Sequence, residues 1–246
     1  MKAFFKHLLV QFKMDIRERG TLMTYYLIPL IFYFVMGAVL SSINPLSGQT
    51  LAASMVIFAV TMGAVLGIPV PIVKMRESGV LRAYRVFGIP EWAVLCIQSV
   101  SAFLHHLVVS MIIFATAPLF FGASYPQNII AYFVTLFILL FSSIMLGLLI
   151  GVTARSQPIA TMLSQAVFLP TVMLGGIMFP VSMLPEPLKV VGRIFPATHI
   201  MQAFLGLAFW LPTESNATIS LLITAGIGVV SAGLTVVRFR AIGRSL

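Results

Sequence analysis

Charged side chains are scarce in this sequence, and so are cysteines. Charged residues make up 9% of the 246 residues, whereas hydrophobic residues make up 60%. A soluble domain usually carries about a quarter charged residues, so this composition excludes a water-soluble fold. The same apolar content excludes a disordered chain. The one cysteine, Cys96, excludes a disulfide within one chain and a metal site built from several cysteines.

Acidic residues and catalytic motifs are also rare or absent. We expect all six carboxylates outside the membrane spans or at their ends: Asp15, Glu18, Glu77, Glu91, Glu186 and Glu214. Metal-dependent membrane transferases need clustered carboxylates, and ion-coupled carriers usually place an acid within a span, so both classes are disfavoured. The sequence contains no Walker A loop, HExxH or GxSxG. We therefore predict that this chain is not an enzyme and binds no metal or cofactor itself.

The sequence contains long apolar runs without any charged residue. A span needs about 20 apolar residues, and the uncharged run from Gly20 to Val73 holds two, separated by a polar turn at 41–48. The expected spans are 22–42, 50–73, 92–118 (ending at Pro118), 128–153, 159–178 and 216–237. Two apolar pieces, 187–195 and 198–211, are too short to span and predict re-entrant helices.

Residues 1–20 are predicted to form a helix that lies in the membrane surface. Their apolar side chains recur at three- and four-residue spacing, and most basic ones lie off that stripe. The fold class is therefore an all-α polytopic membrane protein with an N-terminal interfacial helix, six transmembrane helices, and short re-entrant helices between the fifth and sixth. We expect one transmembrane domain over 1–246, divided into the helix 1–20, spans in 21–73, a cytoplasmic segment 74–91, spans in 92–178, an extracellular segment 179–215, the span 216–237 and a tail 238–246.

The basic residues fall on one side of this arrangement. Six spans put both termini on the same side, and all 15 Lys and Arg residues except Lys189 and Arg193 then lie with the termini. Basic residues gather in cytoplasmic segments. We therefore expect both termini in the cytoplasm, in the cell membrane of a bacterium. The net charge of +9 is explained in the same way, so nucleic acid is not expected as a partner.

The cytoplasmic segment 74–91 is too long for a tight turn and too short for a domain. Interpreted as a helix, it carries Val80, Leu81, Tyr84 and Phe87 at helical spacing beside two arginines. Such a helix can dock into a groove of a cytoplasmic partner or rest on anionic lipid. The spacing alone leaves both interpretations open.

The run Arg76-Glu77-Ser78-Gly79-Val80-Leu81 follows two uncharged spans. It is similar to the Glu-x-Gly-x-Leu signature of the ABC-2 type ABC transporter permeases. A second run resembles the family's Gly-x-x-Phe-Pro…Pro…Pro-x-Thr/Ser-His pattern between the fifth and sixth spans. It reads Gly175-Gly176-Ile177-Met178-Phe179-Pro180, then Leu184-Pro185, then Phe195-Pro196-Ala197-Thr198-His199. The order and spacing of these motifs extend the resemblance over essentially the whole chain.

This resemblance implies the membrane half of an exporter, with ATP and Mg bound by a separate ATP-binding subunit. It also implies a second permease chain, identical or a sister, beside this one in the membrane lipid. Residues 1–20 would be a connecting helix, and coupling to the ATPase would involve Arg76, Glu77, Gly79, Leu81, Tyr84 and Arg85. The re-entrant gate would comprise Gly175, Gly176, Phe179, Pro180, Pro185, Pro196 and His199. Many members carry a basic residue shortly after this histidine, whereas Met201 to Trp210 has none.

Two adjacent histidines lie in the predicted third span. Ionisable residues there suggest a functional site. His105 and His106 point about 100 degrees apart on a helix, so a shared metal or haem is not expected. They either line the transport path or hydrogen-bond between helices. Phe137, Phe141 and Met145 are further candidates for the path lining, or are ordinary lipid-facing or core residues.

Two pairs of glycines lie four residues apart within predicted spans, Gly63 with Gly67 and Gly147 with Gly151. Small residues at this spacing let helices approach closely in a membrane. We expect close packing at both pairs.

The leading hypothesis is a permease subunit of an ATP-driven exporter. Its path would carry hydrophobic or amphipathic cargo, such as a drug, an antibiotic, a lipid or a lipid-linked glycan. The alternative is a stand-alone channel or secondary carrier, in which 74–91 is only a lipid anchor. A third hypothesis is a membrane enzyme or cofactor protein that uses His105, His106 and His199.

Overall fold

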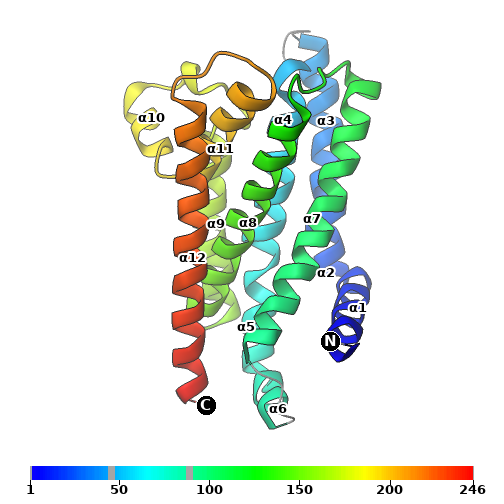
Figure 1. The fold of residues 1–246 in the computed structure, drawn as a ribbon, viewed down its shortest axis with the longest axis vertical. Coiled ribbons are helices and arrows are strands. Elements are labelled where there is room, and N and C mark those ends of the chain that lie inside the picture. The colour runs from blue at the N-terminus through cyan, green and yellow to red at the C-terminus, as the bar shows by residue number, and fades with distance from the viewer. Residues whose placement is uncertain (1, 44–47, 87–90, 246) are drawn as a thin grey trace.

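The computed structural model describes residues 2–43, 48–86 and 91–245, and every regular element in these ranges is a helix. Figure 1 shows an upright bundle with both ends of the chain toward its lower end. In chain order the elements are α1 (Lys2–Arg17), α2 (Arg19–Leu22), η1 (Met23–Leu27), α3 (Ile28–Ile43), α4 (Gly48–Met62), η3 (Gly63–Gly67), α5 (Pro69–Glu77), α6 (Val80–Val86), α7 (Glu91–Phe121), α8 (Ile129–Thr153), α9 (Gln157–Leu174), η4 (Val181–Met183), α10 (Glu186–Gly192), α11 (Pro196–Ala203), η5 (Phe204–Ala208) and α12 (Ala217–Ser245). The elements η1, η3 and η5 are π-helical, and η4 is a 3-10 turn. We call the lower end, with both termini, the terminal end, and we call the segment 175–215 at the opposite end the cap.

Six helices are long and apolar enough to cross a membrane, which confirms the predicted number. They are Arg19–Ser42, Gly48–Glu77, Trp92–Phe121, Ile129–Thr153, Gln157–Leu174 and Ala217–Ala241. Between the fifth and sixth, Glu186–Gly192 and Pro196–Ala208 form a pair bent by 92°. The chain is thus an all-α polytopic membrane protein, with short helices where the re-entrant segment was predicted.

In the structure several spans end at residues other than those predicted, and each difference has a local cause. The second span continues to Glu77, because a helix that leaves the membrane can carry charged residues. The third passes Pro118 and ends at Phe121, since a proline this close to the end of a helix disrupts few hydrogen bonds. The fifth stops at Leu174, because Gly176 has a φ of 78°, a left-handed conformation that commonly ends helices. The sixth continues as a helix into the basic tail.

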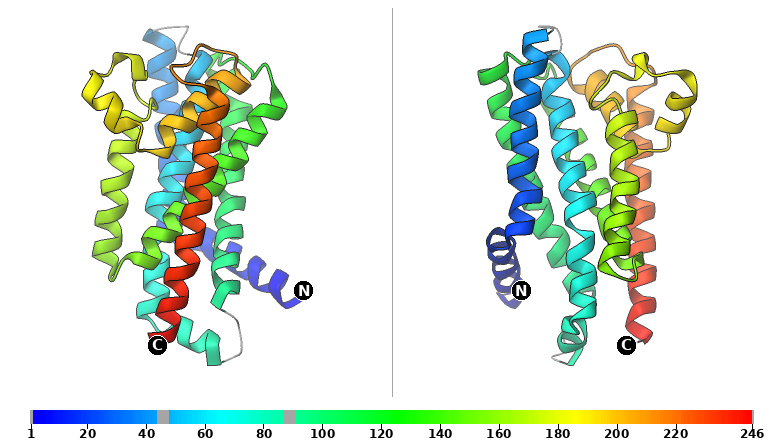
Figure 2. Two further views of the ribbon diagram at one scale, coloured as in Figure 1. Left: turned by 60° about the vertical axis from the view of Figure 1, so that its left-hand side comes forward. Right: turned by 180° about the vertical axis from the view of Figure 1, so that it is seen from behind.

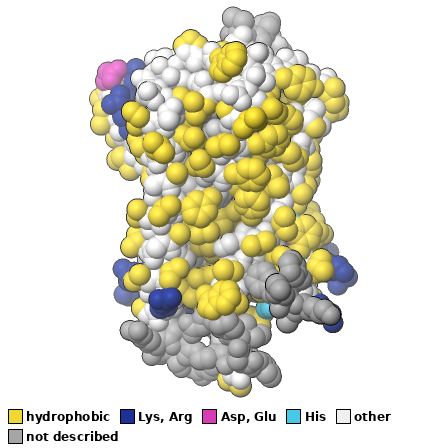
Figure 3. All heavy atoms as spheres, viewed as in Figure 1, with side chains coloured by type: hydrophobic (Ala, Val, Ile, Leu, Met, Phe, Trp, Pro, Cys, Tyr) yellow, Lys and Arg dark blue, Asp and Glu magenta, His cyan; other side chains and the backbone are white. Residues whose placement is uncertain are grey.

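The second span forms the centre of the bundle. In its most apolar stretch 83% of the residues are buried, against 22% in the first span and 28% in the fifth and sixth. One core cluster surrounds α4 on the cap side, and a second surrounds Ile68 toward the terminal end. The outer spans expose apolar side chains across the middle of the face in Figure 3, and the basic side chains lie near the two ends. An apolar middle between charged ends matches the hydrocarbon layer of a bilayer and the polar regions on its two sides.

Glycines let the fourth span approach this central helix closely. A Cβ at Gly147 would overlap the backbone carbonyl of Ala64. A Cβ at Gly151 would lie 3.1 Å from the Cα of Pro69, which is backbone and cannot easily move. The predicted close packing is therefore confirmed between α8 and the segment η3–α5.

The other glycine pair makes room for rings. A Cβ at Gly63 would overlap the imidazole of His106, and a Cβ at Gly67 would overlap the ring of Tyr25. The close packing expected here is therefore between a helix and aromatic side chains of its neighbours. Sequence spacing alone did not distinguish the two kinds of contact.

The helix α1 stands apart from the upright bundle. In the left view of Figure 2 it leaves the bundle at an angle, near the terminal end. It packs against α7 on one side, and on others it exposes Leu9, Val10 and Met14. Exposed apolar residues on such a helix fit the predicted position in a membrane surface.

Candidate functional site

The end of α5 is tied to the turn between α8 and α9. The guanidinium of Arg76 donates a hydrogen bond to the carbonyl of Ala154. The side chain of Gln157 donates to a carboxylate oxygen of Glu77, at 2.6 Å between Nε2 and Oε2. Gly79, with a φ of 74°, then turns the chain into α6. The first coupling residues of the predicted set therefore anchor this segment to the spans.

The short helix α6 confirms the helix predicted from the spacing within 74–91, and it has an inner and an outer side. Leu81 is buried in the core cluster of the terminal end. The hydroxyl of Tyr84 lies 3.2 Å from Nε2 of His7, which ties α6 to α1. Val80 and Val86 face outward, and Val86 is 79% exposed. Among the described side chains of α6, the valines thus provide the exposed surface, whereas Leu81 supports the segment from within.

Part of the predicted coupling set lies outside the described residues. Nothing is described of the side chain of Arg85, and Phe87 falls outside the described ranges.

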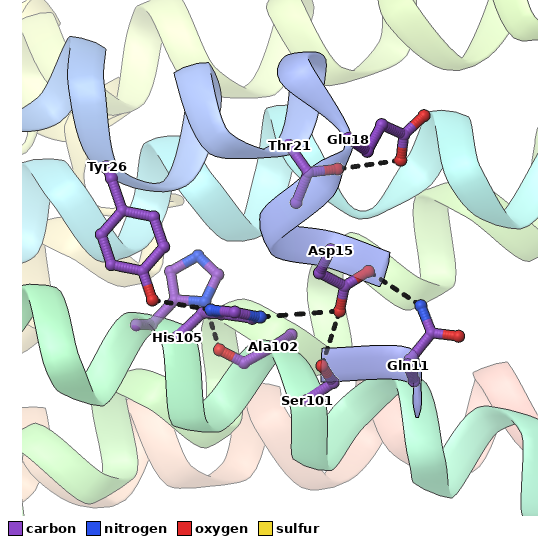
Figure 4. A network of polar contacts seen from close by, with 9 residues as sticks. Gln11, Asp15, Glu18, Thr21, Tyr26, Ser101, Ala102 and His105 are labelled. Atoms are coloured by element: carbon purple, nitrogen blue, oxygen red, sulfur yellow. Dashed lines mark hydrogen bonds and ion pairs between the residues drawn. The ribbon is translucent and has the colours of Figure 1, made fainter. Parts of the chain in front are cut away.

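A polar network joins α1 to the third span, as Figure 4 shows. Asp15 is 6% exposed. Its Oδ2 accepts a hydrogen bond from the hydroxyl of Ser101 at 2.6 Å, and its Oδ1 accepts one from Gln11 at 2.8 Å. Nε2 of His105 lies 3.7 Å from the same Oδ2. Asp15 lies on α1, outside the spans as expected, but α1 packs this carboxylate against the third span and buries it there.

His105 is enclosed by aromatic rings. Its Nδ1 lies 2.6 Å from the hydroxyl of Tyr26. The ring of Phe12 stacks on the imidazole with centroids 4.1 Å apart and parallel planes. The surroundings of this imidazole are thus built by α1 and η1, which His105 joins to α7.

His106 has different neighbours, although it is the next residue. Its Nδ1 lies against the carbonyl of Ala102, and its ring lies 4.6 Å from that of Tyr25. His199 belongs to α11 in the cap, where its Nε2 lies 2.8 Å from the carbonyl oxygen of Arg193. The three histidines of the third hypothesis are therefore not brought together, and the described residues contain no group of three metal-ligating side chains.

The predicted gate residues all lie in the cap. Gly175 and Gly176 end the fifth span and are buried, whereas Phe179 and Pro180 are exposed. Pro185 directly precedes α10, and Pro196 is the first residue of α11, where the fixed φ of proline favours the start of a helix. The prolines therefore set the two helices of the bent pair.

Hydrogen bonds join the two helices of the cap. The buried hydroxyl of Thr198 on α11 donates to the carbonyl of Gly192 on α10, at 2.6 Å. On the outer side, Nζ of Lys189 lies 2.9 Å from a carboxylate oxygen of Glu186, and this hydrogen bond raises the pKa of Lys189. The Thr198 bond thus spans the bend of 92°, whereas Lys189 and Glu186 both belong to α10.

A cavity of about 420 Å³ lies under the cap, between it and the ends of α3 and α4. Met201 and Leu205 make part of its apolar wall, and Ser54 and Gln202 add polar groups. Two predicted gate residues, Gly176 and Pro180, also line it. The cavity can hold a molecule with an apolar body and a few polar atoms.

The predicted path-lining residues lie elsewhere. Phe137 is 46% exposed and stacks on Phe103 of α7, with ring centroids 5.7 Å apart. Phe141 lies against Gly228 of α12, and Met145 packs on the core cluster of the terminal end. Neither these three side chains nor the histidines of α7 line the cavity under the cap. Within one chain the structure therefore does not place them on a common path.

The family comparison covers the α6 segment, the polar network and the cap. The family model described as ABC-2 type transporter matches residues 7–209. The chain belongs to the ABC-2 type transporter family. None of the curated proteins compared with the chain matches it.

In this ABC-2 type chain, sequence motifs located the α6 segment and the cap but missed the polar network. One feature of the sequence points to the network: Asp15 lies three residues after Phe12, on the apolar stripe of α1. A lone acid on an apolar helix face predicts a buried polar partner. Its partners Ser101 and His105 lie in another helix, so only the tertiary structure identifies them.

Proposed function

We propose that the chain is the permease subunit of an ATP-driven exporter, with ATP hydrolysed by a separate subunit. Membership of the ABC-2 type transporter family carries this proposal, in a sequence that has no Walker A loop. A transport protein without a nucleotide site of its own needs a partner that binds its conformations unequally. The exposed helix α6 offers such a partner a place to bind.

In this proposal the terminal end is cytoplasmic, and the ATP-binding subunit docks on the outer side of α6. Val80 and Val86 present apolar surface there, as a short helix that enters a groove does. Leu81 and Tyr84 hold the inner side of α6 to the bundle. Since the end of α5 is also bound to the α8–α9 turn, a displacement of α6 is transmitted to the spans.

The cargo would leave through the cavity under the cap. Its volume of about 420 Å³ lies within the range of small-molecule sites, and its wall is apolar with a few polar groups. These properties support hydrophobic or amphipathic cargo, such as a drug, an antibiotic, a lipid or a lipid-linked glycan. A second permease chain, identical or a sister, would complete the path.

A stand-alone secondary carrier is the second candidate function. The buried carboxylate of Asp15 favours it. This acid lies outside the spans but packs against the third one, and ion-coupled carriers use acids in or beside their spans to bind protons or cations. In that case α6 needs no protein partner.

Purification of the tagged chain in mild detergent, with bound proteins identified and ATPase activity assayed, separates the two candidates. Val86→Asp places a charge on the outer side of α6. Val190→Asp makes the same change in the cap, where Val190 is 58% exposed, and serves as the matched control. We expect a P-loop ATPase to accompany the wild type and Val190→Asp and to be lost with Val86→Asp, while every variant stays monodisperse.

A monodisperse wild-type chain without any bound ATPase would contradict the exporter proposal. Ion flux in liposomes would then test the carrier, with Asp15→Asn as the variant that should abolish the flux.

A further inference from the structure

We propose that a groove between the start of α7 and the end of α12 binds one anionic phospholipid of the leaflet at the terminal end. The groove has a volume of about 330 Å³ and is lined by Trp92 and Leu95 of α7 and by Val236, Phe239 and Arg240 of α12. We call it the lipid groove. It shares no lining residue with the cavity under the cap.

The lipid groove lies where two spans reach the boundary of the membrane. The third span begins at Trp92 and the sixth ends at Ala241, so the lining residues all fall within about two turns of a span end. Tryptophan is enriched at this depth, because its ring is apolar and its N–H is polar. The groove therefore faces the region in which phospholipid head groups join their acyl chains.

The floor of the lipid groove belongs to the packed bundle. Leu95 and Phe239 are 7% and 6% exposed, and both are part of the core cluster at the terminal end. Val236 and Trp92 are exposed beside them. An acyl chain in such a hollow contacts protein on several sides, whereas one on a flat helix face contacts it on one. The groove therefore offers more van der Waals contact than the lipid-facing surface around it.

Little protein fills the space between the two helices at this level. α12 packs mainly against α8 and α11, and its contact with α7 is short. A gap without atoms loses the van der Waals contacts of the side chains that line it. An acyl chain in the lipid groove restores those contacts and joins the third span to the sixth.

Arg240 gives the lipid groove a preference for a negative head group. It is the one charged side chain among the described residues that line the groove, and it is exposed. In the described part of the chain no carboxylate pairs with it, although nothing is described of the side chain of Glu91. Its guanidinium matches the geometry of a phosphate, while its alkyl stem can lie along apolar surface. A net negative lipid fits better than a zwitterionic one, whose ammonium group offsets the phosphate.

A lipid in this groove does not occupy the surface that we assign to the ATPase. No described residue of α6 lines the groove. The inference therefore stands independently of the proposed function.

Trp92 reports directly on the occupant of the lipid groove. The sequence has two tryptophans, and the other, Trp210, lies in the cap, so Trp210→Phe leaves Trp92 as the single fluorophore. The full chain in this background is placed in phosphatidylcholine vesicles that contain increasing fractions of a spin-labelled lipid, either phosphatidylglycerol or phosphatidylcholine. The label sits on the acyl chain just below the head group and quenches tryptophan at short range. We expect phosphatidylglycerol to bind about fivefold more tightly than phosphatidylcholine, the usual effect of one basic residue near anionic lipid.

Two arginines at the end of α12 separate a site from general attraction to the membrane surface. Arg240→Gln removes the charge that lines the groove, and we expect the preference to fall to about onefold. Arg238→Gln removes the same charge at nearly the same depth. Arg238 points about 200 degrees away around the helix and does not line the groove, so the preference should persist. Both arginines are exposed, and exposed substitutions seldom affect folding.

Three results overturn the lipid groove as an anionic site. The first is equal quenching by the two lipids while Arg240 is present. The second is a preference that survives Arg240→Gln or disappears in both variants. The third is an absence of quenching by either lipid, because a second protein chain then covers the groove. The assay contains no ATPase, so none of these results bears on the proposed function.

Discussion

At the scale of single residues, Gly147 shows how little space separates the central helix from the fourth span. A Cβ there would overlap the carbonyl oxygen of Ala64, which belongs to the backbone and has no room to rotate away. Gly233, on the sixth span, has no atom within 4 Å of an equivalent Cβ. Gly147 is therefore at a close contact between helices, whereas Gly233 is not.

We expect Gly147→Ala to lower the free energy of unfolding by about 1 to 3 kcal/mol, the usual cost of overpacking a close contact. Gly233→Ala should leave it unchanged or raise it by up to about 1 kcal/mol, because alanine favours a helix more than glycine does. Thermal unfolding of the two variants in the same detergent measures the difference. Equal midpoints would show that the contact with Ala64 is not tight.

Asp15 shows what sequence could and could not reveal about a single residue. Spacing predicted the helix 1–20, and α1 confirms it over Lys2–Arg17. The same spacing places Asp15 on the apolar stripe, so its burial could have been expected. Its partners could not, since Ser101 is 86 residues away and pairs with it only because α1 packs on α7.

At the scale of elements, α6 presents two sides with different roles. Its helical spacing was evident from the sequence, but the apolar residues occupy more than one face. Which face is buried depends on α5 and α7, against which α6 packs with Leu81 inward and Val86 exposed. A docking surface that is inferred from spacing alone therefore mixes supporting residues with exposed ones.

Leu81→Asp and Val86→Asp separate these roles. We expect Leu81→Asp to lower the free energy of unfolding by about 3 kcal/mol or more, because it buries a charge without a partner. Val86→Asp should change it by less than about 0.5 kcal/mol, as exposed substitutions usually do. Thermal unfolding with size-exclusion chromatography measures both. If Leu81→Asp proved as stable as the wild type, α6 would have to be mobile rather than packed.

The cap offers a second test at this scale. Thr198→Val removes the buried hydrogen bond from α11 to Gly192 of α10, and we expect a loss of about 1 kcal/mol, the usual net contribution of one hydrogen bond, because the carbonyl keeps only its bond from the backbone N–H of Phe195. Thr218→Val is the matched control, since Thr218 is exposed at the start of α12. Thermal unfolding compares the pair. The bend between α10 and α11 would not depend on this bond if both variants behaved alike.

At the scale of the whole molecule, the two ends of the bundle differ in charge. Figure 1 places α1, α6 and the end of α12 toward one end and α10 and α11 at the other. The basic residues lie with the termini, except for Lys189 and Arg193 in the cap. The rule that basic residues stay inside therefore predicts cytoplasmic termini, as the proposed function requires.

Cysteine labelling checks this orientation. In a Cys96→Ser background, Ser182→Cys places a thiol on the exposed surface of the cap and Ser78→Cys places one at the exposed turn before α6. We expect a membrane-impermeant maleimide to label Ser182→Cys in intact cells, and Ser78→Cys only after permeabilisation. The reverse pattern would contradict cytoplasmic termini.

The number of spans was predictable because it depends on length and hydropathy, which sequence contains directly. The span ends were less predictable. The charges after Val73 and the proline at 118 predict boundaries, but the helices continue past both to Glu77 and Phe121. The sequence did not predict that the second span lies at the centre of the bundle. Every span is apolar, and only the packing shows that this one is surrounded by the others while the first, fifth and sixth face outward.

The length of that central helix has a consequence for how a partner reaches the protein. Its 30 residues extend over about 45 Å, whereas the hydrocarbon layer is about 30 Å thick. With its cap end at one boundary of that layer, its other end passes through the lipid headgroups and carries α6 into the aqueous phase. A soluble protein could then bind α6 without displacing lipid, so its affinity should be the same in neutral and in anionic membranes.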